Sequence, residues 1–127
     1  MEKLEAEIKK YLEERGWDKL KPADVAKSIS IEAGELLELF QWSDEELGEV
    51  KKSPEKLAAI RKELADVLIY ALEMAVLLDL DAEKVIADKL EHIRKKYPAE
   101  VMKNRVKRAG NDDAYWKIKK EYRRKGL

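Results

Sequence analysis

Hydrophobic residues recur at intervals of three and four along most of this chain of 127 residues, and that period is typical of amphipathic helices. No stretch alternates between apolar and polar residues as a half-buried strand does. Together with Gly, Pro and capping residues, the pattern predicts helices over residues 2–15, from Pro22 onward, and over residues 54–78, 81–95, 99–109 and 114–125. The expected fold class is therefore all-α, a bundle of four main helices with a short linking helix and a helical tail.

Two further helix starts carry capping signals. Ser43 followed by Glu46 is typical of a capping box, so we expect a short helix from there to about Lys52. Ser53-Pro54 combines a capping residue with a proline at the first helical position, which predicts the start of the longest helix. Near the end of the chain, residues 110–113 predict a turn in which Asp112 or Asp113 caps the last helix.

Charge and composition exclude several classes of protein. Lys plus Arg and Asp plus Glu both total 27, so no net charge steers the chain to nucleic acid or to a membrane. The chain has no Cys and a single His, His92, which excludes disulfides, thiolate metal sites and a His cluster. The opening MEKLEAEIKK lacks a signal-peptide apolar stretch, and the apolar run from Val67 to Leu80 is interrupted by Glu73 and Asp79. We expect one cytoplasmic domain.

Two pairs of acids stand out because their neighbours are apolar. Glu32 and Glu35 lie three residues apart, as do Glu63 and Asp66, so each pair shares one face of a helix. Such pairs usually lie on solvated faces beside Lys, but the segment from Ile31 to Trp42 contains no Lys or Arg. Four acids in apolar surroundings repel one another, and Mg²⁺ is a hard cation that takes oxygen ligands. Spacing alone leaves two interpretations open, a metal site and a structural ion-pair network.

The residues that carry these pairs resemble a known family. EAGELLELFQW, ELADVLIYAL and KKYP together resemble the MazG-like all-α nucleotide pyrophosphohydrolases, and among these the small dCTP pyrophosphatase branch. The match runs from about Pro22 to Pro98, within a single domain over residues 1–127 that ends in a helical extension over residues 99–127. The resemblance implies an intertwined homodimer or homotetramer. It also implies Mg²⁺-dependent hydrolysis of a nucleoside triphosphate to the monophosphate and pyrophosphate, with Mn²⁺ as a substitute.

The resemblance also implies roles for individual residues. Glu32, Glu35, Glu63 and Asp66 match the family's Mg²⁺ ligands. For the reaction itself, we expect Glu35 or Glu38 to be the carboxylate that orients or deprotonates water for attack at the α-phosphate. The expected substrate-binding residues are Trp42 at the nucleotide pocket, Tyr70 facing the phosphates, and Lys89 and Lys96 near the phosphate groups.

Two departures from the family pattern leave the base open. Leu20-Lys21 stands where an aromatic-His pair is frequent, and Ile93 stands where Asn is common. Both fall where the base or sugar would be read, so dUTP, a modified nucleotide or a phosphoribosyl nucleotide remain alternatives to dCTP. A different class of function also remains open, a non-catalytic helical interaction module that docks through the basic stretch from Lys117 to Lys125.

Overall fold

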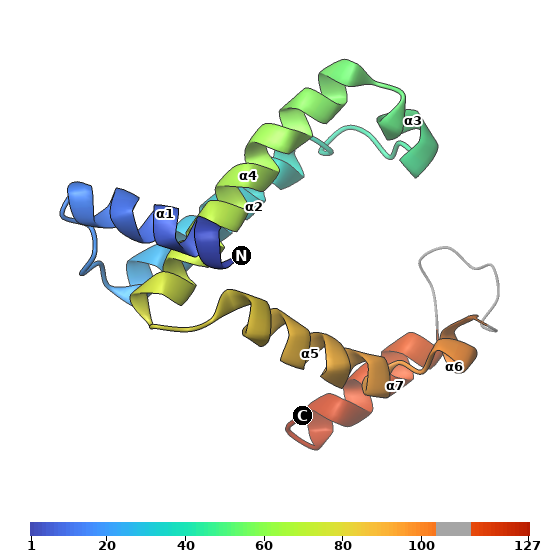
Figure 1. Cartoon of the computed structure of the whole chain (residues 1–127). Helices are drawn as coiled ribbons and strands as arrows, with labels where there is room; N and C mark the ends of the chain where they lie inside the picture. The colour runs from blue at the N-terminus through green and yellow to red at the C-terminus, as the bar shows by residue number, and fades with distance from the viewer. Residues whose placement is uncertain (104–112) are drawn as a thin grey trace. The chain divides into compact units, whose positions relative to one another are not determined.

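The computed structural model describes residues 1–103 and 113–127, and within them all regular secondary structure is α-helical. The helices are α1 Glu2–Glu14, α2 Pro22–Glu38, α3 Leu47–Lys51, α4 Pro54–Leu77, α5 Ala82–Lys96, α6 Ala99–Lys103 and α7 Asp113–Arg124 (Figure 1). The all-α prediction is confirmed. The end of the helix predicted over residues 99–109, and the predicted turn before Asp113, lie outside the described residues. None of the described helices is both long enough and apolar enough to cross a membrane.

The chain divides into two compact units, Met1–Ala82 and Glu83–Leu127. In the first unit α2 packs along α4, and α1 and α3 each pack against α4 as well. Helix α4 therefore lies at the centre of the unit that holds both acid pairs. The single domain predicted from the sequence stays a prediction.

The helix starts show which local signals determined the fold. Pro22 and Pro54 begin α2 and α4, and the Ser53 hydroxyl accepts a hydrogen bond from the Lys56 amide at 3.2 Å. The capping box predicted at Ser43 is wrong. The Ser43 hydroxyl instead donates to a Glu45 carboxylate oxygen at 3.1 Å, and α3 begins only at Leu47. The nearer carboxylate therefore competes successfully for the serine that was expected to cap the helix.

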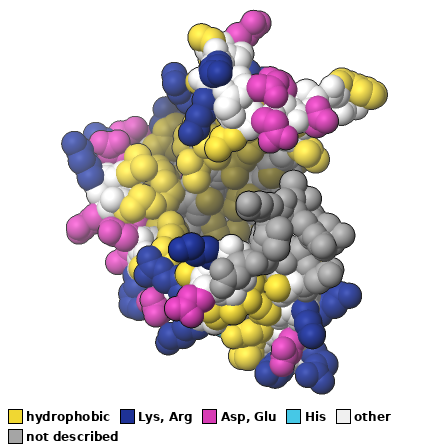
Figure 2. All heavy atoms as spheres, turned by 90° about the vertical axis from the view of Figure 1, so that its right-hand side faces the viewer, with side chains coloured by type: hydrophobic (Ala, Val, Ile, Leu, Met, Phe, Trp, Pro, Cys, Tyr) yellow, Lys and Arg dark blue, Asp and Glu magenta, His cyan; other side chains and the backbone are white. Residues whose placement is uncertain are grey.

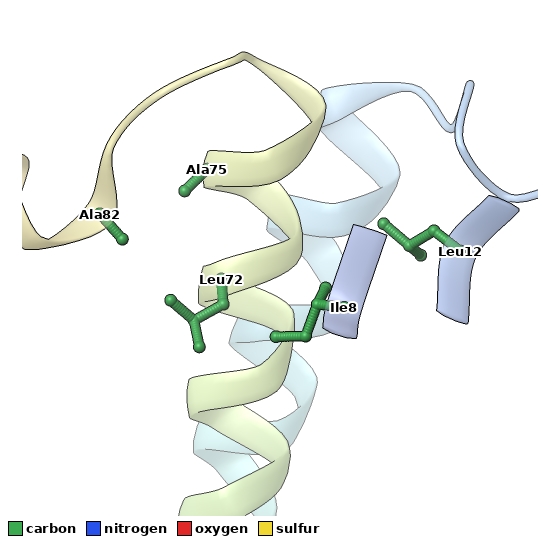
Figure 3. Close-up of a cluster of buried hydrophobic side chains, with 5 residues drawn as sticks. All are labelled: Ile8, Leu12, Leu72, Ala75 and Ala82. Carbon is green, nitrogen blue, oxygen red and sulfur yellow. The ribbon is translucent and has the colours of Figure 1, made fainter. Parts of the chain in front are cut away.

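A small hydrophobic cluster joins α1 to the second half of α4. Figure 3 shows Ile8 and Leu12 of α1 with Leu72 and Ala75 of α4 and with Ala82, the first residue of α5. The Ala82 amide donates to a carboxylate oxygen of Glu5 in α1 at 3.1 Å, which satisfies a backbone donor at the start of α5. These contacts fix α1 across the end of α4.

Many large apolar side chains of the helices are exposed in the single chain. Val25 is 2% exposed, but Leu37 of α2 and Leu68 of α4 are 70% and 53% exposed. Trp17, in the connection between α1 and α2, is 45% exposed in the single chain. Figure 2 shows hydrophobic side chains gathered over part of the visible surface. Exposed apolar area of this kind is typical of a surface that binds another protein.

In the second unit, aromatic side chains connect α5 and the residue that follows it, Tyr97, with α7. The rings of Tyr97 and Tyr115 stack with centroids 5.0 Å apart, and His92 meets Tyr122 edge-on at 6.0 Å. The Lys96 ammonium lies 5.3 Å from the centroid of Tyr97 and 5.1 Å from that of Tyr122. Cation–π contacts therefore accompany the aromatic packing in this unit.

Candidate metal centre

Three carboxylates from α2 and α4 converge in the first unit. Glu32 of α2 and Glu63 and Asp66 of α4 each place one carboxylate oxygen within 4.8 Å of the others. All three residues are half-buried. Because α2 packs along α4, the acid pairs of the two helices face the same contact between them.

Two carboxylate oxygens of these residues have no hydrogen-bond partner among the described residues. Glu32 Oε2 and Glu63 Oε2 are both buried, and none of the described residues donates to either atom. Lys62 Nζ lies 4.0 Å from Glu63, but its side chain is 78% exposed, so solvent screens the pair. A buried acceptor without a donor is costly unless a cation or donor is supplied. The donor set therefore fits a hard, oxygen-coordinated divalent cation.

Glu35 completes the set of acids that we call the carboxylate cluster, namely Glu32, Glu35, Glu63 and Asp66. Glu35 is more exposed than the other three. A hydrogen bond with Glu32 and the charge of Glu32 raise its pKa, burial and the charge of Glu38 raise it further, and a hydrogen bond with Glu63 lowers it. Glu35 is thus coupled to acids on both helices.

The pKa of Glu63 is raised as well. Burial is the largest cause, and the charges of Glu35 and Asp66 act in the same direction, whereas Lys62 lowers the pKa. Both shifts show that the cluster carries more negative charge than its surroundings stabilise. Protonation and cation binding are the two ways to relieve that repulsion.

The remaining acid and aromatic candidates lie on the same two helices or, for Trp42, in the turn that follows α2. Glu38 is the last residue of α2, exposed, and close enough for its charge to raise the pKa of Glu35. Trp42 lies in the turn after α2 and is 90% exposed. Tyr70 is half-buried one turn beyond Asp66 on α4, and both residues line one cavity. The packing of α2 against α4 therefore brings the candidate acids and Tyr70 together, whereas Trp42 projects into solvent.

The two basic candidates belong to the second unit. Lys89 lies on α5 and is exposed. Lys96 lies at the end of the same helix, half-buried, with its ammonium against the rings of Tyr97 and Tyr122. Within its unit, Lys96 thus has aromatic neighbours that hold its side chain in place.

Lys56 holds the segment that carries Trp42. Its ammonium donates to the Leu39 carbonyl at the end of α2, and lies 3.6 Å from a Glu45 carboxylate oxygen and 4.7 Å from the Phe40 ring centroid. One residue of α4 therefore contacts three points of the connection between α2 and α3. No local pattern in the sequence marks Lys56 for this role, because its partners lie 11 to 17 positions away along the chain.

Two adjoining cavities of about 380 and 220 Å³ lie beside the cluster. Tyr11, Tyr70 and Glu73 line both of them, and Asp66 also lines the larger one. We call this pair of cavities the trough. In the sequence, Glu73 is recognisable only as an interruption of an apolar run. The signal that could have found it is an acid between Leu72 and Met74, on the helix that already carries two acids.

Comparison with known proteins identifies the family. The sequence matches the MazG-like family over residues 27–111. The chain belongs to the MazG-like family. This confirms the resemblance carried by EAGELLELFQW and ELADVLIYAL.

Named relatives come from the branch that the sequence predicted. The chain is 35% identical to human dCTP pyrophosphatase 1 over 96 residues, which cover 74% of this chain and 56% of the relative. It is 37% identical to the protein of the same name from Bos taurus over 90 residues, which cover 69% and 53%. The chain thus spans about half the length of the curated relatives it matches.

A solved structure supports the same assignment. A pyrophosphatase from Archaeoglobus fulgidus is 35% identical and aligns with a TM-score of 0.67. The alignment covers 77% of this chain and 92% of that protein. The all-α fold of this chain is therefore one that a MazG-like relative also adopts.

Proposed function

We propose that this chain hydrolyses a nucleoside triphosphate to the monophosphate and pyrophosphate, with Mg²⁺ as cofactor. The observation that carries the proposal is the convergence of Glu32, Glu63 and Asp66, two of them with a buried oxygen that lacks a donor. The names of the relatives, dCTP pyrophosphatase and pyrophosphatase, favour this reaction class.

The carboxylate cluster is the set of residues that would hold the cation. Its oxygen ligands suit Mg²⁺, and Mn²⁺ accepts the same ligand type. When bound, the cation supplies positive charge to phosphate oxygens. Glu35 is the exposed member, so it is the acid of the cluster that a nucleotide reaches first.

The other proposed roles belong to side chains around the cluster. The Glu38 carboxylate, or that of Glu35, accepts a proton from the water that attacks the α-phosphate. Tyr70, beside Asp66, donates its hydroxyl to a phosphate oxygen. Lys89 and Lys96 pair with phosphate oxygens, and Trp42 shapes the nucleotide pocket. No covalent intermediate is needed.

We further propose that the chain acts as a homodimer or homotetramer. The exposed apolar residues of α2 and α4, such as Leu37 and Leu68, support this because a second copy would remove them from water. The same contact would give Trp42, 90% exposed in the single chain, a surface on which to pack.

Product analysis tests the proposed function. Wild-type protein and Glu63→Gln are incubated with a panel of canonical and modified nucleoside triphosphates, with and without Mg²⁺. We expect pyrophosphate and the monophosphate from the wild type only when Mg²⁺ is present, and almost none from the variant. Release of orthophosphate would mean that another bond is cleaved, and an inert wild type would contradict the proposal.

A further inference from the structure

The last helix, α7, carries an excess of positive charge to which the proposed function gives no role. Residues 114–125 contain six basic residues and a single acid, Glu121, whose carboxylate pairs with Lys125 at 3.2 Å. The match to the family ends at residue 111, so α7 lies beyond it. The charge of α7 therefore has to be explained from its own surroundings.

Three cations lie around the tyrosines that connect α7 with the end of α5. The ammonium of Lys119 lies 5.5 Å from the ring centroid of Tyr115. Lys96 lies 5.3 Å from the ring centroid of Tyr97, and that ring stacks on Tyr115. Tyr115, Lys119 and Arg123 follow one another at four-residue spacing, so they share one face of α7.

The pKa values of the two tyrosines show that these cations act on their hydroxyl groups. A hydrogen bond with Lys119 and the charge of Lys119 lower the pKa of Tyr115, and Tyr97 and Lys96 lower it further, although burial acts in the opposite direction. Burial and the neighbouring Tyr115 raise the pKa of Tyr97, whereas the charge of Arg123 lowers it. Lys96, Lys119 and Arg123 are thus gathered around one pair of hydroxyl groups.

No acid balances the three cations in the described part of the chain. The ion pairs found there on α5 and α7 use other basic residues, so Lys96, Lys119 and Arg123 have no carboxylate partner. Like charges held together repel one another, and an anion relieves that repulsion. Ammonium, guanidinium and hydroxyl donors are the groups that bind phosphate oxygens. The ring contacts also restrain Lys96 and Lys119, which reduces the side-chain entropy lost on binding.

We propose that Lys119 and Arg123 of α7, together with Lys96 and the hydroxyl groups of Tyr97 and Tyr115, form a binding site for a phosphate chain, either that of a nucleotide or free pyrophosphate. The inference rests on the proposed function for the role of Lys96, and it extends phosphate binding to a helix outside the family match. Lys119 is the central residue, because it is half-buried and contacts Tyr115 directly.

Binding of inorganic pyrophosphate without Mg²⁺ tests this site. In the absence of the metal, the carboxylate cluster repels pyrophosphate, so a calorimetric titration reports on the basic site. We expect Lys119→Gln and Arg123→Gln each to raise the Kd about tenfold, because each removes a charged donor. Lys119→Arg keeps the charge and should bind nearly as tightly as the wild type. Lys117→Gln is the matched control, since it removes the same charge from the opposite side of α7.

The variants separate lost charge from altered packing. A wild type that does not bind pyrophosphate, a wild-type Kd in Lys119→Gln, or an equal loss in Lys117→Gln would overturn the inference. A loss in Lys119→Arg as large as that in Lys119→Gln would also overturn it, because it would indicate disturbed ring packing. Circular dichroism checks that the helices persist, and if Lys119→Gln loses them, the exposed Arg123 gives the same test. None of these measurements requires a triphosphate to be hydrolysed.

Steady-state kinetics with dCTP and Mg²⁺ identify the source of the phosphate chain. If the phosphates of the nucleotide occupy the site, Lys119→Gln should raise the KM for dCTP about tenfold with little change in kcat, and Lys119→Arg should restore it. If the KM keeps its wild-type value while the Kd for pyrophosphate rises, the site holds free pyrophosphate. Both results support a phosphate site on α7, whereas an unchanged Kd for pyrophosphate overturns it and leaves the proposed function standing.

Discussion

At the scale of single residues, burial and unpaired oxygens separate the acids of the site from the many acids of the surface. The two acid pairs in apolar surroundings could be recognised from the sequence, because residues spaced three apart lie on the same face of a helix. Glu73 could not be selected in this way. A lone acid in an apolar run looks like a solvated position until the packing of α1 against α4 buries it.

Neutralising one member of the carboxylate cluster should separate activity from stability. We expect Glu63→Gln and Asp66→Asn each to reduce pyrophosphate release by about 100-fold or more, since each removes an oxygen charge needed for the cation. Without metal, each variant should melt at or above the wild-type temperature, because mutual repulsion is relieved. Steady-state kinetics and thermal melts measure both effects. An Asp66→Asn variant with full activity would remove the basis of the proposed centre.

The pH dependence of stability should report on Glu73. Its pKa is raised above the ordinary value of 4.5, so the folded state binds this proton more tightly than the unfolded state. The resulting contribution to stability is present below about pH 4 and is lost as pH rises through the raised pKa. The wild type should therefore melt below Glu73→Met at about pH 7 and close to it at about pH 4. A constant difference between the two proteins across this range would show that Glu73 titrates normally.

At the scale of elements, strong local signals set most helix bounds. Pro22 and Ser53-Pro54 start α2 and α4 where predicted, because proline at the first helical position loses no hydrogen bond. Ser43 failed as a cap because Glu45 competes for its hydroxyl. The contact of Lys56 with the end of α2 was not predictable, since it depends on how two helices pack.

Lys56→Met tests whether this contact holds the segment after α2. The substitution keeps an apolar stem but removes the donor to the Leu39 carbonyl and the partner of Glu45. We expect the free energy of unfolding to fall by about 1–2 kcal/mol. Amide exchange in residues 40–45 should become faster. Lys10→Met, which removes an exposed surface pair, is the control. Unchanged exchange would mean that the segment is held by other contacts.

At the scale of the whole molecule, the hydrophobic pattern predicts which helix faces are apolar, but it does not predict what packs against them. Periodicity marks a position as apolar whether it packs within the chain or against a second copy. Leu37 of α2 and Leu68 of α4 are apolar positions of this kind, and the single chain leaves both exposed. The predicted homodimer or homotetramer would explain why so few side chains are buried in one copy.

Leu68→Gln tests the assembly. It removes apolar area at a position that is 53% exposed in the single chain, so the fold of one copy should tolerate it. We expect the wild type to sediment as a dimer or tetramer. The variant should dissociate at protein concentrations about tenfold higher than those at which the wild type dissociates, which corresponds to a loss of about 1.4 kcal/mol in the free energy of association. Leu127→Gln at the end of the chain is the control. A monomeric wild type would contradict the proposed assembly.

The most direct test of the central claim is the effect of Mg²⁺ on the melting temperature, measured in parallel for the metal-free wild type and Asp66→Asn. A ligand that binds only the folded state, at about 100 times its Kd, adds about 2.7 kcal/mol to the free energy of unfolding. We expect a saturable rise for the wild type and little or none for the variant. No rise in the wild type, or an equal rise in both proteins, would show that the carboxylate cluster is not a magnesium site.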